Sequence, residues 1–503
     1  MPFRSAAIFW CTCSLLACKV GPNFVPPNEP TPPGYTEAAA DPSKPASLQM
    51  DDRTAPDPLW WRQFGDAKLN ALEDLAASEN IGLKASYLRI VAARIQVQGA
   101  RAQGLPSLNG TASYTREQLG LAGIVKSQGL GSGSTPPAVQ NLISSLEQPI
   151  NLYQLGFDAS WELDLFGRVR RSVEAADAQR QQAVESRNDL LVSLQAEVAE
   201  TYFQLRAGQF LRQLVHTLIE DQREVLELTK NRQEHGLGSE ADVQTARAQL
   251  ASLESQLPPY EQTVESSRHA LAVLCGKSPE AFDTELKDTG AMPSLPQAVP
   301  VGVPSMLARR RPDIRNAEAA LHAATAQVGV SMASLFPQVS LTGTLGLRNT
   351  STRYLFDWAS KFYTAGAGVN VPIFHGGALI ENVQLSRTEA AVAALNYRST
   401  VLSALQEVED GISGLRAGLE RSAALNESVI ANQRALDIDV DAYKHGLVTY
   451  ITVLTVQLQT VQARQQLAQA LLSESIDLIK LYKALGGGWE VANGVAAASE
   501  PPR

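Results

Sequence analysis

An internal repeat constrains the fold of this chain more than any other feature of its sequence. Glu234-His235-Gly236-Leu237 recurs as Lys444-His445-Gly446-Leu447. Leu205-Arg206-Ala207 recurs as Leu415-Arg416-Ala417 at the same distance along the chain. Shared order and constant spacing make a chance similarity improbable, so the chain holds two copies of one structural unit. Each copy predicts the same series: helix, strand, loop, strand, long helix, turn and helix.

The repeat also sets the domain boundaries. We expect the first copy at residues 61–257 and the second at residues 305–488, joined by an inter-repeat segment at residues 258–304. The first copy carries a Gly/Ser/Pro-rich insertion, predicted as a loop over residues 118–150. Residues 489–503 are predicted to be a frayed tail.

Four segments alternate strictly between apolar and polar residues and predict strands. They cover about 107–116, 152–165, 338–348 and 362–373. Such a two-faced strand can lie between lipid and a water-filled lumen, and it can equally belong to a half-exposed soluble sheet. A strand length of about 10 residues favours the membrane. So does the lack of any apolar run of about 18 residues beyond the first residues of the chain.

Four strands are too few to form a closed wall in a membrane. The smallest membrane barrels have about 8 strands, and an open edge in lipid leaves backbone groups unsatisfied at several kcal/mol each. We therefore expect other copies of the chain to complete the barrel, with three copies giving about 12 strands. Its lumen would be lined by the polar residues Asp158, Glu162 and Asp164.

Long helices account for most of the remaining sequence. No proline occurs between Gly376 and Tyr443, and apolar residues there recur at alternating steps of four and three, which predicts a coiled coil. The turn His445-Gly446-Leu447 separates this helix from a returning one, with glycine as the stop. The first repeat predicts the same hairpin, with residues 170–235 outgoing and Gly236-Leu237-Gly238 as the turn.

The first residues predict export and lipidation. Residues 1–17 have the apolar core of a signal peptide, and Leu15-Leu16-Ala17-Cys18 is typical of a lipoprotein cleavage box. The alternative is an ordinary cleaved signal followed by an incidental cysteine. Residues 18–60 are rich in proline and predict an extended linker laid over a surface.

Charge and composition exclude several classes of function. A net charge of −9 without a basic stripe argues against a nucleic-acid partner, and the short runs Arg309–Arg311 and Arg168–Arg171 are interpreted as solvated or helix-end patches. The six histidines lie far apart, with no metal-ligand spacing, and no nucleophile elbow occurs. We therefore expect no catalytic site, no metal and no cofactor. Cys275 is predicted to be a small buried apolar residue.

Several motifs in a fixed order resemble one family. They are Trp161-Glu162-Leu163-Asp164-Leu165-Phe166-Gly167-Arg168, Gly236-Leu237-Gly238-Ser239 with Asp242, Arg310-Arg311-Pro312-Asp313, Phe336-Pro337, and Pro372-Ile373-Phe374. Together they resemble the TolC-like outer-membrane efflux proteins, in the lipoprotein branch that serves resistance–nodulation–division pumps. The arginine-containing motif is interpreted as a structural helix start.

The resemblance implies an architecture and a set of partners. Three chains would form a twelve-stranded barrel in the outer membrane and a helical tunnel through the periplasm. A periplasmic adaptor and an inner-membrane pump would supply drugs or other small molecules for export. The turns would lie at the tunnel tips, and the pore would close just past them. The residues concerned are Gly236, Leu237, Asp242, Gly446, Leu447, Ile451, Thr452 and Thr455.

Thr452 and Thr455 bear on the properties of the closed pore. Several relatives of the resembled family carry acidic residues at matching positions, whereas this chain has threonine at both. Because an acidic ring attracts cations more strongly than hydroxyl groups do, we expect multivalent cations to block this pore weakly.

Other functions stay open at this point. A periplasmic coiled-coil lipoprotein acting as a scaffold would share the signal, Cys18 and the heptads, but would not need four two-faced strands. The same channel could instead serve protein export or metal export. The five methionines form no cluster, which disfavours a soft-metal relay.

Overall fold

The structure is a computed structural model. It describes residues 19–36, 49–51, 54, 56–118, 148–287, 290, 292–293, 295–296 and 298–490. The predicted signal peptide, Cys18, most of the predicted loop and residues 491–503 lie outside the described residues. The chain divides into two compact units. The first, called the sheet unit, comprises residues up to 25, 93–179 and 322–392, and the second, called the core unit, comprises residues 26–92, 180–321 and from 393 onward.

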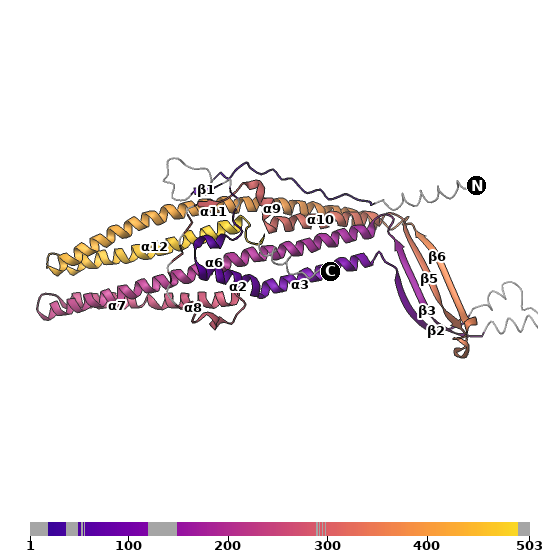
Figure 1. Cartoon of the computed structure of the whole chain (residues 1–503), viewed down its shortest axis with the longest axis horizontal. Coiled ribbons are helices and arrows are strands. Elements are labelled where there is room, and N and C mark those ends of the chain that lie inside the picture. The colour runs from indigo at the N-terminus through magenta and orange to yellow at the C-terminus, as the bar shows by residue number, and fades with distance from the viewer. Residues whose placement is uncertain are drawn as a thin grey trace, which may run out of the picture. The chain divides into compact units, whose positions relative to one another are not determined.

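A four-stranded antiparallel sheet dominates the sheet unit, and each repeat supplies two of its strands. Its strands are β2 (Ser107–Glu117), β3 (Ile150–Leu163), β5 (Gln338–Asn349) and β6 (Lys361–Asn370), in the order β2-β3-β5-β6 (Figure 1). The strand β6 ends before the predicted residue 373. Pro372 follows closely, and its ring leaves it without an N–H for a ladder hydrogen bond.

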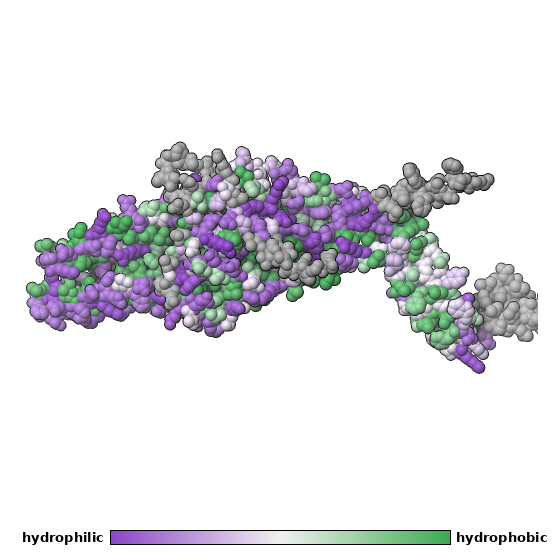
Figure 2. Space-filling model, in the orientation of Figure 1, coloured by the Kyte–Doolittle hydropathy of each residue, from purple (hydrophilic) through white to green (hydrophobic). Residues whose placement is uncertain are grey.

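The two faces of this sheet differ as the alternation predicts. The register places Phe157 opposite Leu345, and Leu345 opposite Tyr363, so these large apolar side chains share one face. All three are exposed in the single chain. Figure 2 shows hydrophobic residues gathered over the strands on the side in view. An uncovered apolar surface of this kind requires lipid or another chain against it.

Two helical hairpins follow the strands. The outgoing helices α6 (Arg168–Glu234) and α11 (Ala378–Lys444) have 67 residues each. After α6 the chain returns through α7 (Glu240–Glu254) and α8 (Leu257–Leu274), and after α11 through α12 (Tyr450–Ala484) (Figure 1). The break between α7 and α8 coincides with prolines in the first turn of α8. No helix among the described residues has both the length and the hydropathy needed to cross a bilayer.

The remaining elements are shorter than the outgoing helices α6 and α11. The other α-helices are α2 (Ala67–Glu79), α3 (Ile81–Ala102), α9 (Leu307–Arg310) and α10 (Pro312–Ala333). The 3₁₀ helices are η2 (Trp60–Phe64), η3 (Pro279–Phe282), η4 (Pro304–Met306), η5 (Thr352–Tyr354) and η6 (Trp358–Ser360). Strands β1 (Gln49–Asp51) and β4 (Ala298–Pro300) form a parallel pair, so the linker hydrogen-bonds to the inter-repeat segment, which its proline content did not predict.

The main hydrophobic core lies in the core unit, where both repeats and the linker meet. Trp60 is fully buried and stacks on Tyr482 of α12, with 5.2 Å between ring centroids. Phe64 packs edge-on against Phe203 of α6 at 4.9 Å. The end of the linker at Trp60 and the start of the first repeat therefore pack between the helices, so the linker does not lie only over their surface.

Candidate functional site

Both hairpin turns have the same backbone geometry. Gly236 and Gly446 each have φ of 74°, the left-handed conformation that ends a helix and that glycine adopts without strain. The N–H of Leu237 donates to the carbonyl of Arg232 at 2.8 Å, and Leu447 makes the equivalent bond at 2.9 Å. The two leucine side chains are 71% and 78% exposed. The predicted tip residues thus project apolar groups into solvent.

The predicted pore-closing residues lie in the first turns of the returning helices. Asp242 of α7 forms a capping box with Ser239, in which each side chain accepts a 3.2 Å bond from the other residue's N–H. At the same place in the second repeat, the hydroxyls of Thr449 and Thr452 lie 3.3 Å apart. One repeat therefore presents a carboxylate where the other presents a hydroxyl.

The other two predicted pore-closing residues lie on the first turns of α12. Ile451 is 65% exposed. The Thr455 hydroxyl donates to the Ile451 carbonyl at 2.8 Å. Because this hydroxyl is neutral, it offers a solvated cation less attraction than a carboxylate at the same position would.

Side chains near the tips tie one hairpin to the other, and the sequence did not reveal these ties. The Arg232 guanidinium lies over the Tyr443 ring, 4.7 Å from its centroid, and donates to the Tyr443 carbonyl at 3.2 Å. Gln222, fully buried on α6, donates to the Tyr450 hydroxyl at 3.3 Å. The heptad pattern marked Tyr443 only as a seam residue, since periodicity carries no information on cross-hairpin partners.

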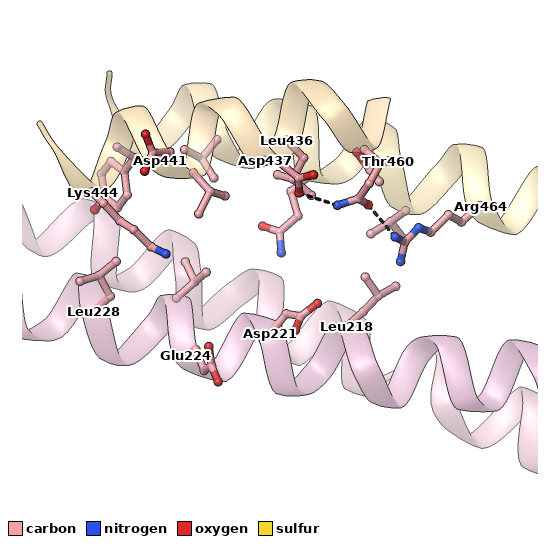
Figure 3. Close-up of a pocket in the computed structure, with 17 residues that line it drawn as sticks. Leu218, Asp221, Glu224, Leu228, Leu436, Asp437, Asp441, Lys444, Thr460 and Arg464 are labelled. Atoms are coloured by element: carbon pink, nitrogen blue, oxygen red, sulfur yellow. Dashed lines mark hydrogen bonds between the residues drawn. The ribbon is translucent and has the colours of Figure 1, made fainter. Parts of the chain in front are cut away.

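A groove of about 620 Å³ lies between α6 and the pair α11 and α12 (Figure 3). Its apolar wall includes Leu218, Leu228 and Leu436, and its charged residues are Asp221, Glu224, Asp437, Asp441, Lys444 and Arg464. Burial raises the pKa of Asp221, and Glu224 raises it further. The groove is thus apolar within and mostly acidic among its charges.

A short relay of polar groups crosses one end of this groove. Arg464 donates to Gln433 at 2.5 Å, and Gln433 donates to Asp437 at 2.8 Å (Figure 3). The relay joins α12 to α11, so it stabilises the second hairpin internally rather than joining the two hairpins.

Two of the predicted lumen residues belong to the polar face of β3. Asp158 accepts hydrogen bonds from the hydroxyls of Thr111 at 2.8 Å and Thr344 at 2.9 Å. Glu162 accepts two bonds from the Arg168 guanidinium, at 3.0 and 2.7 Å. Both carboxylates therefore also hold neighbouring elements in place.

The third predicted lumen residue, Asp164, requires correction. The strand ends at Leu163, and the Asp164 carboxylate accepts bonds from the N–H groups of Val169 at 3.1 Å and Arg170 at 3.0 Å. It is a cap at the N-terminus of α6, with a side chain only 16% exposed. An aspartate directly after an alternating run continues the strand pattern, which is why the alternation misplaced it.

The residues after Cys18 are held firmly at the start of α6, although Cys18 lies outside the described part. The Val20 N–H donates to the Phe166 carbonyl at 3.2 Å, and Lys19 pairs with Glu174 at 2.5 Å. Arg171, fully buried, donates to the carbonyls of Val20 and Gly21, each at 3.0 Å. The basic run in the sequence predicted a solvated or helix-end patch, and Arg171 does lie in the first turn of α6, but the run did not reveal its burial or its bonds to the N-terminal segment.

The described residues contain no cluster of metal-ligating side chains. The lone described cysteine, Cys275, is buried at the end of α8. Burial, with a smaller contribution from the charge of Glu73, raises the pKa of its thiol to about 12. At neutral pH the thiol is protonated, so this residue packs as an apolar group.

Comparison with known proteins identifies the family. A model of the family described as outer membrane efflux protein matches residues 72–277 and 303–487. The first matched segment includes α8, which the repeat pattern placed in the inter-repeat segment. Nodulation protein T of Rhizobium leguminosarum bv. viciae is 28% identical over 94% of this chain and 92% of its own length. The toluene efflux pump outer membrane protein TtgC of Pseudomonas putida is 30% identical over 97% of this chain and 96% of its own length.

Solved structures agree with this family. The outer-membrane channel OprN is 31% identical and superposes with a TM-score of 0.82, covering 94% of this chain and all of the other. The open state of the Neisseria gonorrhoeae MtrE outer membrane channel is 26% identical, with a TM-score of 0.75 over 94% of this chain and 99% of the other.

The fold and the relatives therefore lead to one conclusion. The tandem repeats, the four-stranded sheet and the helical hairpins are those of trimeric channels that combine a β-barrel with a helical tunnel, which confirms the predicted fold class. The protein is an outer-membrane channel of the efflux type and extends into the periplasm. The chain belongs to the outer membrane efflux protein family.

Proposed function

We propose that three copies of this chain form a passive conduit that exports drugs or other small molecules from the periplasm, together with an adaptor and an inner-membrane resistance–nodulation–division pump. The observation that carries the proposal is the sheet with one exposed apolar face, one polar face and two free edges, at β2 and β6. In lipid those edges need partner strands, and sister chains supply them.

The helix tips are the proposed docking site for the adaptor. Leu237 and Leu447 are exposed apolar side chains on glycine turns of the same backbone geometry, a suitable surface for a partner's apolar contacts. The groove beside them is long, apolar within and acidic among its charges, which favours a partner helix with apolar and basic residues.

The closing ring of the pore is proposed for the turns just past the tips. Asp242, Ile451, Thr452 and Thr455 lie there on the two returning helices. The ties from Arg232 and Gln222 to the second hairpin would hold the closed arrangement, and opening would require them to break or to shift.

The proposed lipid anchor is Cys18. Lys19 and Val20 lie beside the start of α6, where β3 ends, and Arg171 fixes the segment there. An acyl chain on the preceding residue would thus emerge near the end of the sheet, where a membrane surface is expected. This position supports lipidation over an incidental cysteine.

Planar-bilayer recording with the purified full-length protein tests the channel. We expect stable conductance and a detergent-solubilised particle with about three times the protein mass of one 54.1 kDa chain. A monomeric particle without conductance would refute the proposal.

Docking is tested separately from conduction. Replacing Leu237 and Leu447 with aspartate should abolish efflux in cells that lack their own channel while leaving conductance intact. The double alanine variant is the matched control and should keep partial efflux. Full efflux with both aspartates would remove the tips from the docking surface.

A further inference from the structure

An aromatic side chain lies on the polar face of the sheet near one end. Among the described residues of the four strands, Phe362 is the one aromatic residue that the register places on that face. A Cβ built on Gly346 of β5 would lie 3.0 Å from the Phe362 ring. Gly346 pairs with Gly156, and a Cβ on either glycine would overlap the partner strand's backbone. The glycine pair thus provides a flat surface against which this ring packs.

Arg348 completes the arrangement. Its guanidinium lies over the Phe362 ring, 4.3 Å from the centroid. Its Nε and Nη2 donate to Oε1 of Gln154, the residue opposite in the register, at 3.1 and 2.8 Å. The ring and the amide together fix the guanidinium plane.

One edge of this guanidinium has no partner among the described residues. Of the five N–H donors of an arginine, those of Nε and Nη2 that face Gln154 are used, and no described residue accepts a bond from Nη1. Arg348 is exposed, and no carboxylate of the described chain forms an ion pair with it. An exposed edge with two nitrogens matches the spacing of a carboxylate's two oxygens.

Arg348 lies at the end of the sheet where we expect the lumen of the proposed channel to open to the outside. Arg348 lies one residue before the end of β5, at the end of the sheet opposite to Leu163 and the start of α6. Asp158, the central carboxylate of the same face, lies four residues from Gln154 on β3, about 13 Å away at ~3.3 Å per residue. In the proposed trimer this face carries Asp158 at mid-height and Arg348 nearer its outer end, with Glu117 further out on the same face.

The geometry points to a subsite for organic carboxylates, above all aromatic ones, formed by Arg348 and Phe362 at the outer end of the lumen. It rests on the proposed channel function. The free edge of Arg348 binds the carboxylate in the plane of the guanidinium, and the ligand's ring, which extends from that edge, contacts the edge of Phe362. Because both residues face water, binding is weak, as passage through a conduit requires.

The test uses planar bilayers with benzoate and acetate as probes. For the wild type we expect a concentration-dependent reduction of current by benzoate that is stronger than by acetate, and its reversal potential in a KCl gradient is the reference for the variants. Arg348→Gln should shift the reversal potential toward cations and raise the half-blocking benzoate concentration about tenfold. Arg348→Lys should keep the reversal potential yet lose most of the benzoate effect, since an ammonium lacks the planar fork.

Further variants distinguish the contribution of the Phe362 ring from that of the Arg348 charge. Phe362→Leu should leave the reversal potential and the acetate effect unchanged and weaken the benzoate effect. Arg116→Gln removes an arginine from the opposite face of the sheet and should change neither readout.

The experiment distinguishes a failure of the proposed subsite from a failure of the proposed channel. A wild-type protein that conducts, with Arg348→Gln giving the same reversal potential and benzoate effect, would overturn the subsite alone. A wild-type protein that is monomeric and does not conduct would overturn the channel as well. If Arg348→Gln forms no channels, Arg348→Lys decides, because unchanged benzoate sensitivity in that variant refutes the subsite.

Discussion

Nη2 of Arg171 and Oδ1 of Asn23 lie 2.9 Å apart, joining a fully buried arginine of α6 to the segment that follows Cys18. Among the described residues, Glu174 is the acidic partner of this guanidinium, at 3.0 Å. The remaining bonds go to Asn23 and to backbone carbonyls of the N-terminal segment. The N-terminal segment therefore supplies most of the hydrogen-bond acceptors of Arg171, and Arg171 in turn holds that segment against α6.

We predict that Arg171→Ala destabilises the protein by about 3–5 kcal/mol, because buried acceptors lose their donor. Limited trypsin treatment should then cleave after Lys19 faster than in the wild type. Thermal unfolding in detergent measures the first effect. Arg168→Ala, which removes a partly exposed pair with Glu162, is the control and should cost about 1 kcal/mol or less. Equal effects of the two variants would contradict the proposed role of Arg171.

Arg311 at the start of α10 supports a second stability prediction. It donates to both oxygens of Asp313, at 3.0 and 2.7 Å, and to the Ala484 carbonyl at 2.9 Å, and it is buried. Asp313→Ala should lower stability by about 3 kcal/mol, since it leaves a buried cation with one carboxylate fewer. Glu490→Ala, which breaks the Arg310 pair, should cost less. Unchanged melting of Asp313→Ala would show that Glu407 alone compensates the charge.

Glu73 of α2 gives the protein a dependence on pH. It is fully buried, and neither carboxylate oxygen has a hydrogen-bond partner among the described residues. Burial raises its pKa well above 4.5, and Asp74 raises it further. Below pH 4.5 both folded and unfolded states hold the proton. Above it the unfolded state ionises first, so stability falls by about 1.4 kcal/mol per pH unit until the folded pKa is reached.

Glu73→Gln should therefore remove this loss of stability, and melting curves from pH 4 to 8 should show a smaller decline than in the wild type. Glu79→Gln is the control, because a hydrogen bond from Lys84 lowers the pKa of Glu79, and a carboxylate with a lowered pKa does not cause stability to fall as pH rises. A decline that is the same with and without Glu73 would assign the pH dependence to other groups.

Thr452 allows the proposed closing ring to be tested by gain of function. Three Thr452→Asp side chains would place carboxylates at the proposed constriction, so a trivalent cation should block the variant at a concentration at least about tenfold lower than the wild type. Single-channel recording measures the block. Thr388→Asp, an exposed position on α11 far from the turn in sequence, should behave like the wild type. No gain of block at Thr452 would place the constriction elsewhere.

The strands and hairpins were predictable because they depend on periodicity. Alternation over residues 152–165 located β3 within two residues at either end, although the strand is Ile150–Leu163. Glycine at residues 236 and 446 located both turns, since few other residues adopt that φ without strain. These features are local, so a sequence contains them directly.

What could not be predicted depends on partners far away in the sequence. Arg171 looks like any arginine in a basic run until Asn23 and Val20 are placed beside it. The ties of Arg232 and Gln222 to the second hairpin arise only when two helices from different repeats pack together. The start of the predicted tail is similar, because Trp489 donates to the Arg310 carbonyl at 2.8 Å instead of fraying.

The free edges of β2 and β6 have a consequence for genetics. In the proposed trimer each barrel contains strands from three chains, so one chain with a defective strand disrupts a barrel that also contains two intact chains. In a cell making equal amounts of intact and defective chains, random mixing leaves only about one assembly in eight wholly intact. A loss-of-function mutation in a strand should thus be dominant when the chain still assembles. A mutation that prevents assembly altogether should be recessive, because the intact chains then assemble only with one another.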